Sequence, residues 1–319
     1  MQNKTLRAIT AIAIIFSSTV LIVSFYCSAA PSSSRDNATY LIVGLDDAAE
    51  NADSIMIVNS NFESGKLTVM HIPRDTYYKY GAGQNKINGL YPFLRSRSEN
   101  KAEALTAFLE KISTSLGIHI DGAFALTIST FGEIVDKIGG VKIEIKERCV
   151  FLDENSSVLL SLDSGEHTLY SEDAKIFVRH RKGYRAGDLS RIDMQKLFVT
   201  AFIKNVSELS SFSLLKAYDS VKEDLISTIP LTHFLKNAPK LRGRIKDQQV
   251  RSFTAPGEPI YSSEGISYYS LNSFAMKKAL ETLFLTKEFD TDKSFLKDGD
   301  VAFENVYFDS NFDFEIHTS

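Results

Sequence analysis

The chain has 319 residues, of which 44% are apolar and 24% are charged, and its net charge is −4. This composition excludes a disordered or collagen-like chain and a membrane protein with many spans. Residues 286–319 contain nine acidic and three basic side chains, which leaves residues 1–285 with a net charge of +2. The negative total and the absence of a recognition motif argue against nucleic-acid binding. Two cysteines are too few for a disulfide framework or a zinc site built on thiolates.

The N-terminal segment has the pattern of a membrane anchor. Residues 8–30 are 23 consecutive positions without a charge, and a helix of this length can cross a hydrocarbon core of about 30 Å. Lys4 and Arg7 precede the run, so we expect residues 1–7 to be a cytoplasmic tip and the rest of the chain to lie outside. A cleavable signal peptide is the alternative, because Ser28–Ala30 offers small residues near a cleavage point. The length of the run favours a retained anchor.

The part of the chain that follows alternates between strand and helix patterns, which predicts an α/β domain with three layers, helix on sheet on helix. The expected elements are strands at Tyr40–Leu45, Ser54–Asn59 and Lys66–Ile72, a loop over Pro73–Leu90, a helix over Lys101–Leu116, a strand at Gly122–Ile128, a helix capped by Ser129 or Thr130 and stopped by Gly139 and Gly140, a strand at Val141–Glu147, a helix over Glu172–Arg179 that runs into a strand, a long amphipathic helix over Arg191–Leu209, and mostly helix in Leu214–Leu285.

The same patterns predict the division of the chain into parts. Residues 31–39 form a short linker, residues 40–285 form one outer domain, and residues 286–319 form a tail in which phenylalanine alternates with acids. The tail is either a disordered extension or an edge strand. Because the linker is short, the outer domain is expected to work close to the membrane surface.

Carboxylates gather at the ends of two neighbouring predicted strands. Asp46 and Asp47 follow the first strand, and Asp53 begins the second. Two carboxylates in these positions can converge on one hard cation, which prefers oxygen ligands and keeps places for water and phosphate. The same acids also suit an ordinary turn, because aspartate is a common turn residue.

An arginine follows the third predicted strand. Arg74 stands next to Asp75, and Lys86 comes at the end of the loop that follows. A guanidinium group that is oriented by a carboxylate can bind phosphate through two parallel hydrogen bonds. A purely structural pair of Arg74 and Asp75 is the alternative.

A second basic segment lies in the middle of the chain. Arg179 and Arg181 are two residues apart on a stretch that we expect to be extended, so their side chains project to the same side and can grip one polyanion. Arg191 and Gln195 share one face near the start of a predicted helix, where anions bind favourably. The alternative is a solvated basic loop.

The order of these motifs along the chain is more specific than any single motif. The motifs are Leu41–Asp46, Asp53 with Ser54, Ile72–Thr76, Lys86–Asn88, Gly139–Val141, Val178–Arg181, and Gly187 and Asp188 followed by Arg191 and Gln195. This series resembles the LytR-CpsA-Psr (LCP) family, strongly from Tyr40 to Leu209 and weakly to Leu285. The resemblance implies an LCP-type domain with a mixed central sheet behind one N-terminal transmembrane helix.

The resemblance also implies a function. Members of the family are single-pass proteins of the cell membrane whose catalytic domain is extracellular. They are phosphotransferases that move an anionic glycopolymer, of the teichoic acid or capsule type, from a polyprenyl pyrophosphate carrier to peptidoglycan. The implied partners are therefore this carrier-linked polymer, peptidoglycan and the membrane, and no nucleic acid.

The family's functional residues can be placed on this chain position by position. By this resemblance, Asp46 and Asp53 would bind Mg²⁺, with Mn²⁺ as the alternative, since both ions accept carboxylate and phosphate oxygens. The pyrophosphate contacts would be Arg74, Arg179, Arg181 and Gln195, and the catalytic residues would be Arg74, Asp188, which activates the acceptor, and Arg191, which steadies the phosphates. A cavity for the prenyl chain would be lined from Phe108, Phe124, Phe131, Leu197, Phe198 and Phe202, although such residues are more often plain core.

Two departures from the family pattern affect the phosphate contacts. The chain has Asn51 and Met194 where the family usually has arginine. Each loss removes a charge-assisted contact worth about 1.5–3 kcal/mol. Lys86 or Arg185 is expected to take over this contact, or the affinity is lower.

Two other functions fit the same residues. A metal-dependent hydrolase of polyprenyl pyrophosphates would use water in place of the glycan hydroxyl. A non-catalytic regulator of the cell envelope would bind the prenyl pyrophosphate without turnover, and the missing arginines favour it.

Overall fold

The computed structural model of the chain describes residues 37–48, 51–61, 67–81, 84–153, 155–179, 188–229, 250–262, 265–283 and 317–318. The expected cytoplasmic tip, the anchor at residues 8–30 and the start of the linker lie outside these residues. Within them, none of the helices combines the length and the apolar character that a membrane crossing needs.

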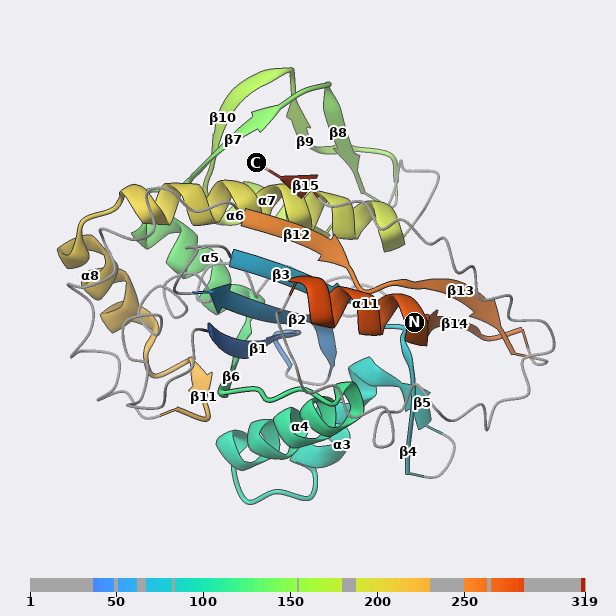
Figure 1. Cartoon of the computed structure of the whole chain (residues 1–319). Helices are drawn as coiled ribbons and strands as arrows, with labels where there is room; N and C mark the ends of the chain where they lie inside the picture. Colours follow the sequence, from blue (N-terminus) through green and yellow to red (C-terminus); the bar gives the residue numbers. More distant parts are fainter. Residues whose placement is uncertain are drawn as a thin grey trace.

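A seven-stranded sheet forms the centre of the molecule (Figure 1). In spatial order its strands are β11 (Ile226–Ser227), β6 (Gly122–Thr127), β1 (Asn37–Leu45), β2 (Ala52–Asn61), β3 (Leu67–Ile72), β12 (Val250–Thr254) and β15 (His317–Thr318). The pairs β1–β6 and β3–β12 are parallel, and the other neighbouring pairs are antiparallel. The prediction of a mixed central sheet is therefore confirmed.

Two hydrophobic cores lie on the two faces of this sheet, because successive side chains of a strand point to opposite faces. In β1, Tyr40 and Ile42 belong to one core, whereas Leu41 and Val43 belong to the other. Figure 1 shows α7 and α4 on opposite sides of the sheet. The first core is covered by α5 (Ile128–Lys137), α6 (Ser171–Arg179), α7 (Asp188–Glu208) and α8 (Ser211–Val221), and the second by α3 (Leu90–Arg95), α4 (Lys101–Leu116) and α11 (Ser273–Leu283).

Among the described residues, four two-stranded pairs lie outside the central sheet. They are β4 (Tyr77–Tyr80) with β5 (Gln84–Lys86), β7 (Val141–Ile145) with β10 (Gly165–Leu169), β8 (Cys149–Leu152) with β9 (Val158–Leu162), and β13 (Gly257–Tyr261) with β14 (Ser267–Leu271). Strands β7 to β10 project beyond α7 at the top of Figure 1. The expectation of a plain loop over Pro73–Leu90 was wrong, because it contains the β4–β5 pair and a 3₁₀ turn (Ile87–Gly89).

The helix over Lys101–Leu116 is confirmed with the predicted bounds. Its apolar residues recur at helical spacing, Asn100 caps its first turn by accepting from the Glu103 amide, and Gly117 ends it with a φ of 64°. The start of α5 differs from the prediction. Its cap is Thr127, which accepts a hydrogen bond from the Thr130 amide, so the helix begins before Ser129.

The prediction of mostly helix in Leu214–Leu285 was wrong for the described part of this segment, where β11, β12, β13 and β14 stand between α8 and α11. Strand β12 has five residues and takes its place through parallel pairing with β3, far away in the sequence. Five residues are too few to show a clear strand pattern in the sequence, and the strand they pair with lies elsewhere in the chain.

Two polar side chains between α7 and the sheet are buried. His71 on β3 forms a 3.0 Å hydrogen bond between its Nε2 and the Ser252 Oγ on β12. Its burial, aided by the positive charge of Lys196, lowers the pKa of His71 from 6.5 to about 3. His71 is therefore neutral in the folded protein at any physiological pH.

This burial predicts a loss of stability in mild acid. As the pH falls from 7.5 to 5.0, an unfolded His71 with its ordinary pKa of 6.5 takes up a proton, whereas the folded one, with a pKa of about 3, does not. The free energy of unfolding should fall by about 2 kcal/mol from this group alone. Urea denaturation at both pH values should show this part of the loss in the wild type and not in His71→Gln. An identical pH dependence in the two proteins would contradict the prediction.

Candidate functional site

The candidate site lies at one edge of the central sheet. Because β1 and β3 are both antiparallel to β2, they run in the same direction, and their carboxyl ends meet at the edge where β2 begins. Asp46 follows β1, Asp53 is the second residue of β2, and Arg74 follows β3 directly after Pro73. The sheet therefore places at one edge three residues that are well separated in the sequence.

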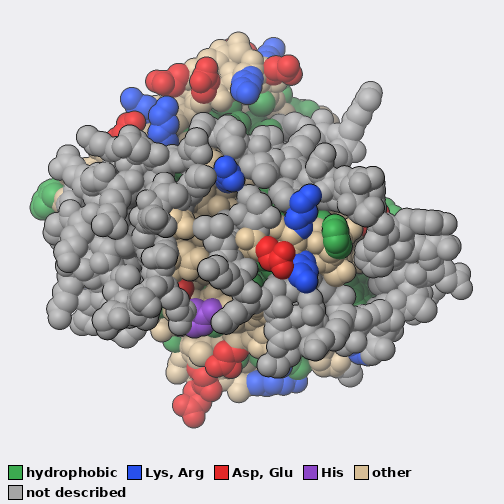
Figure 2. Space-filling model, in the orientation of Figure 1, with side chains coloured by type: hydrophobic (Ala, Val, Ile, Leu, Met, Phe, Trp, Pro, Cys, Tyr) green, Lys and Arg blue, Asp and Glu red, His purple; other side chains and the backbone are tan. Residues whose placement is uncertain are grey.

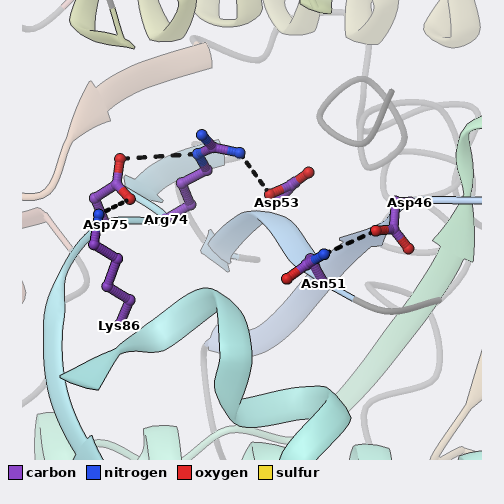
Figure 3. Close-up of polar contacts among 6 residues, drawn as sticks. All are labelled: Asp46, Asn51, Asp53, Arg74, Asp75 and Lys86. Atoms are coloured by element: carbon purple, nitrogen blue, oxygen red, sulfur yellow. Dashed lines mark hydrogen bonds and ion pairs between the residues drawn. The ribbon is translucent and has the colours of Figure 1, made fainter. Parts of the chain in front are cut away.

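Asp53 and Arg74 form an ion pair at this edge. The Arg74 Nη1 lies 2.8 Å from the Asp53 Oδ1, and the two side chains are 15% and 4% exposed. The sequence suggested Asp75 as the partner of Arg74, and this carboxylate lies 3.8 Å from the Arg74 Nε. Figure 3 shows the guanidinium group between the two carboxylates. Asp53 was expected to be a metal ligand, and its contact with Arg74 could not be read from the sequence.

Lys86 adds a second positive charge beside Asp75. Its Nζ lies 2.8 Å from the Asp75 Oδ1 and 5.5 Å from the centre of the Tyr268 ring. The Tyr269 amide donates a hydrogen bond of 2.9 Å to the Asp75 carbonyl, so β14 supports the segment that carries Arg74. On the face shown in Figure 2, acidic and basic side chains also lie next to one another near the middle of the view. The sequence carried no local signal for the role of β14.

Asp46 is the second acid of the site and is buried. Its Oδ2 accepts a hydrogen bond of 3.0 Å from the Asn51 Nδ2, and its amide donates to the Asn51 carbonyl at 3.2 Å. Asp47, the next residue, is exposed and accepts hydrogen bonds from the Ser129 amide and hydroxyl at the start of α5. Asp47 thus stabilises a helix N-terminus, where a negative charge is favourable.

Arg179 is the last residue of α6, so the expectation that it stands on an extended stretch was wrong. The helix continues to this point because Phe177 and Val178 pack into the core. Burial lowers the pKa of the Arg179 guanidinium to about 10, while the carboxylates of Asp47, Glu172 and Asp53 act in the opposite direction. Arg179 is therefore positively charged at neutral pH and interacts electrostatically with the acids at the edge of the sheet.

Gln195 connects α7 to the end of α6. Its side chain is 2% exposed, and its Nε2 donates a hydrogen bond of 3.1 Å to the Val178 carbonyl. Gln195 thus supports the turn that carries Arg179. Asp188 and Arg191 lie in the first turns of α7, which begins at Asp188.

Several predictions on this segment are not decided by the structure. The side chains of Asp188 and Arg191 are not described. Arg181 and Arg185 lie outside the described residues, so their part in the site stays a prediction. Met194, which stands where the family usually has arginine, packs against the first core.

The residues expected to line a prenyl cavity do not all lie together. Phe124, Phe131, Phe198 and Phe202 share the first core, but Phe108 belongs to the second core on the opposite face of the sheet, and Leu197 is 37% exposed. Phe108 therefore does not share one cavity with these four phenylalanines, and the cavity role of the others stays a prediction. A cavity of about 740 Å³ lies between α4, α8 and β11, and its described lining contains Phe124 and none of the charged site residues.

The model of the LytR_cpsA_psr family matches residues 18–284. The chain belongs to this family. One relative is the polyisoprenyl-teichoic acid–peptidoglycan teichoic acid transferase TagT of Bacillus subtilis. It is 24% identical over 261 residues, and the match covers 78% of this chain and 76% of TagT. The corresponding transferase TagU of Halalkalibacterium halodurans is 27% identical over 236 residues, or 72% of this chain and 73% of TagU.

A solved structure of the family has the same fold. TagT bound to LIIa-WTA superposes with a TM-score of 0.61 and 23% sequence identity, and the match covers 78% of this chain and 90% of TagT. The α/β architecture with a mixed central sheet is therefore that of the LytR_cpsA_psr proteins.

Proposed function

We propose that this protein is a transferase that moves an anionic glycopolymer, of the teichoic acid or capsule type, from a polyprenyl pyrophosphate carrier to peptidoglycan. Membership of the LytR_cpsA_psr family and the names of the relatives TagT and TagU support the reaction class. The main structural support is that Asp46, Asp53 and Arg74 lie at the same edge of the sheet. Arg179 interacts electrostatically with Asp53 there.

The acids fit a divalent cation. Asp46 and Asp53 are 5% and 4% exposed and offer hard carboxylate oxygens. Among the described residues no group of three or more potential metal-ligating acids, histidines or cysteines occurs. Mg²⁺ is usually held by one or two carboxylates together with waters and substrate phosphates. When bound, Mg²⁺ or Mn²⁺ would neutralise charge on the pyrophosphate oxygens.

The arginines supply the remaining positive charge. Phosphoryl transfer depends mainly on positioning and on charge stabilisation around the phosphorus, for which guanidinium groups are suited by their planar pairs of donors. Arg74 and Arg179 would bind the pyrophosphate oxygens, with Arg181 as a further contact. Lys86 is held at the border of the site by Asp75 and would add a point charge. Gln195 would act by holding the end of α6 in place.

Asp188 and Arg191 complete the proposed reaction. A sugar hydroxyl of peptidoglycan attacks the phosphorus that is linked to the polymer, and Asp188 takes the hydroxyl proton. The bond from this phosphorus to the bridging oxygen breaks, and polyprenyl phosphate leaves while Arg191 steadies the phosphate charge. No nucleotide is consumed, because the pyrophosphate bond supplies the energy.

Product analysis tests this function. The full chain is incubated with polyprenyl pyrophosphate-linked labelled polymer and peptidoglycan. We expect label joined covalently to glycan strands. Free phosphorylated polymer would instead indicate a hydrolase that uses water. Binding of the carrier without any product would indicate a non-catalytic regulator.

Removal of the metal should stop the reaction. We predict that chelation with EDTA lowers the transfer rate at least about a hundredfold, because the pyrophosphate charge is then no longer neutralised at the acids. Adding back Mg²⁺ or Mn²⁺ in excess should restore the rate, and Na⁺ at equal ionic strength serves as the control. An unchanged rate in EDTA would contradict a metal cofactor.

The proposed location is the cell membrane, with residues 8–30 as a single span and the catalytic domain outside. The charge-free length of this segment supports the span. External protease on intact cells should digest the domain and leave the N-terminal segment in the membrane fraction. Resistance to the protease until the cells are lysed would argue for the opposite orientation.

A further inference from the structure

Asn51 closes the connection between β1 and β2 directly at the site. Its carbonyl accepts a hydrogen bond from the Asp46 amide at 3.2 Å, and its Nδ2 donates to the Asp46 Oδ2 at 3.0 Å (Figure 3). One residue thus holds both the main chain and the carboxylate of Asp46.

The strand register shows why this position matters. Gly44 pairs with Ser54 and Leu45 pairs with Ala52, so Asp53 is the extra residue of a bulge on β2. A bulge changes the direction in which a side chain points and is common beside functional sites. The bulge therefore sets the direction of Asp53, and Asn51, one residue before β2, sets that of Asp46.

The donor that Asn51 offers to the Asp46 carboxylate is a neutral amide. A neutral amide can fix the orientation of a carboxylate that ligates a cation. Carboxylates that ligate metals are commonly held by such hydrogen bonds, and loss of the partner typically costs 10- to 100-fold in metal affinity.

We propose that Asn51 is a positioning residue that orients the Asp46 carboxylate for a divalent cation. This inference rests on the cation site of the proposed function. It assigns to Asn51 a role in metal affinity rather than in contact with the phosphates.

The test uses the full chain and Mn²⁺ alone as the probe, with free Mn²⁺ followed by electron paramagnetic resonance. Asn51→Leu keeps the approximate size and removes the donor. We expect it to bind Mn²⁺ at least about tenfold more weakly than the wild type. In the transfer assay it should need a correspondingly higher Mg²⁺ concentration and approach the wild-type rate at saturation, which a general structural defect would not produce.

Asn59→Leu is the matched control. Asn59 also lies in the β1–β2 pair, and its Nδ2 donates to the Thr39 Oγ1 at 2.9 Å, at the end of the strands remote from the acids. Its Mn²⁺ affinity should stay within twofold of the wild type. Asn155→Leu, at an exposed position, provides the second control if Asn59→Leu fails to fold.

Three results would overturn the inference: wild-type Mn²⁺ affinity in Asn51→Leu, an equal loss of affinity in Asn51→Leu and the folded control, or a wild type that transfers polymer but binds no Mn²⁺. The last of these leaves the proposed transferase function standing. A wild type that binds Mn²⁺, loses affinity in Asn51→Leu and transfers no polymer would support the inference and defeat the proposed function instead.

Discussion

Replacing Arg74 with alanine should lower the rate of polymer transfer about a thousandfold, to the background of the assay. The guanidinium group lies at the edge of the sheet between Asp53 and Asp75, where it would stabilise the charge that develops on the phosphate oxygens. Removal of one such donor typically costs 100- to 1,000-fold in rate. The measurement is the initial rate of label transfer to peptidoglycan.

Folding and function can be separated at this position. Arg74→Ala also removes the ion pair of the buried Asp53, at a cost of about 3 kcal/mol in stability, so folding must be checked by circular dichroism at the assay temperature. Arg74→Lys keeps a positive charge beside Asp53 but loses the paired donors that fit phosphate, so it should fold and still lose most of the rate. Full transfer by both variants would defeat the assignment.

An exposed arginine provides the control for Arg74. Arg148 is 67% exposed and forms an ion pair of 3.3 Å with Asp163, which is 81% exposed. Exposed pairs of this kind contribute little to stability. Arg148→Ala should therefore transfer polymer at the wild-type rate.

Arg179→Ala, in contrast, should lose polymer transfer in the same assay, because the Arg179 guanidinium interacts electrostatically with the acids of the site.

Replacing Phe198 with alanine should have the largest effect on stability. The Phe198 ring is fully buried and lies 5.6 Å from the ring of Phe131, 6.3 Å from that of Phe177 and 6.3 Å from that of Phe202. Truncation leaves a cavity between α5, α6 and α7 and should lower the free energy of unfolding by about 3–5 kcal/mol. Urea denaturation measures the change.

The matched control is the exposed Phe212 on α8, which is 76% exposed. Phe212→Ala should change the free energy of unfolding by less than about 0.5 kcal/mol. If Phe198→Ala cost less than about 1 kcal/mol, the packing of α7 on the sheet would be looser than these contacts imply.

Elements with a strong local pattern could be predicted from the sequence. The helix over Lys101–Leu116 has apolar residues at helical spacing, a capping Asn100 and a terminal Gly117, and its bounds agree with the structure. The first three strands are rich in apolar and β-branched residues, although β1 begins at Asn37, earlier than predicted. In these segments the residues near in sequence carry the information.

Elements that depend on distant partners were predicted poorly. The short β12 is a strand because it pairs with β3, and β14 reaches the site because the Tyr269 amide bonds to the Asp75 carbonyl. Arg179 ends a helix because Phe177 and Val178 pack into the core. None of these contacts can be read from a window of neighbouring residues.

By itself, the sequence predicted the acids and arginines of the site, whose order along the chain resembles that of the LytR_cpsA_psr family except at Asn51 and Met194. Only the tertiary structure decided the partners. Asp53 pairs with Arg74 because β2 and β3 are neighbours in the sheet, Lys86 pairs with Asp75, and Asn51 holds Asp46. The physical reason is that side-chain type is local, whereas the distance between two charges depends on strand order and register.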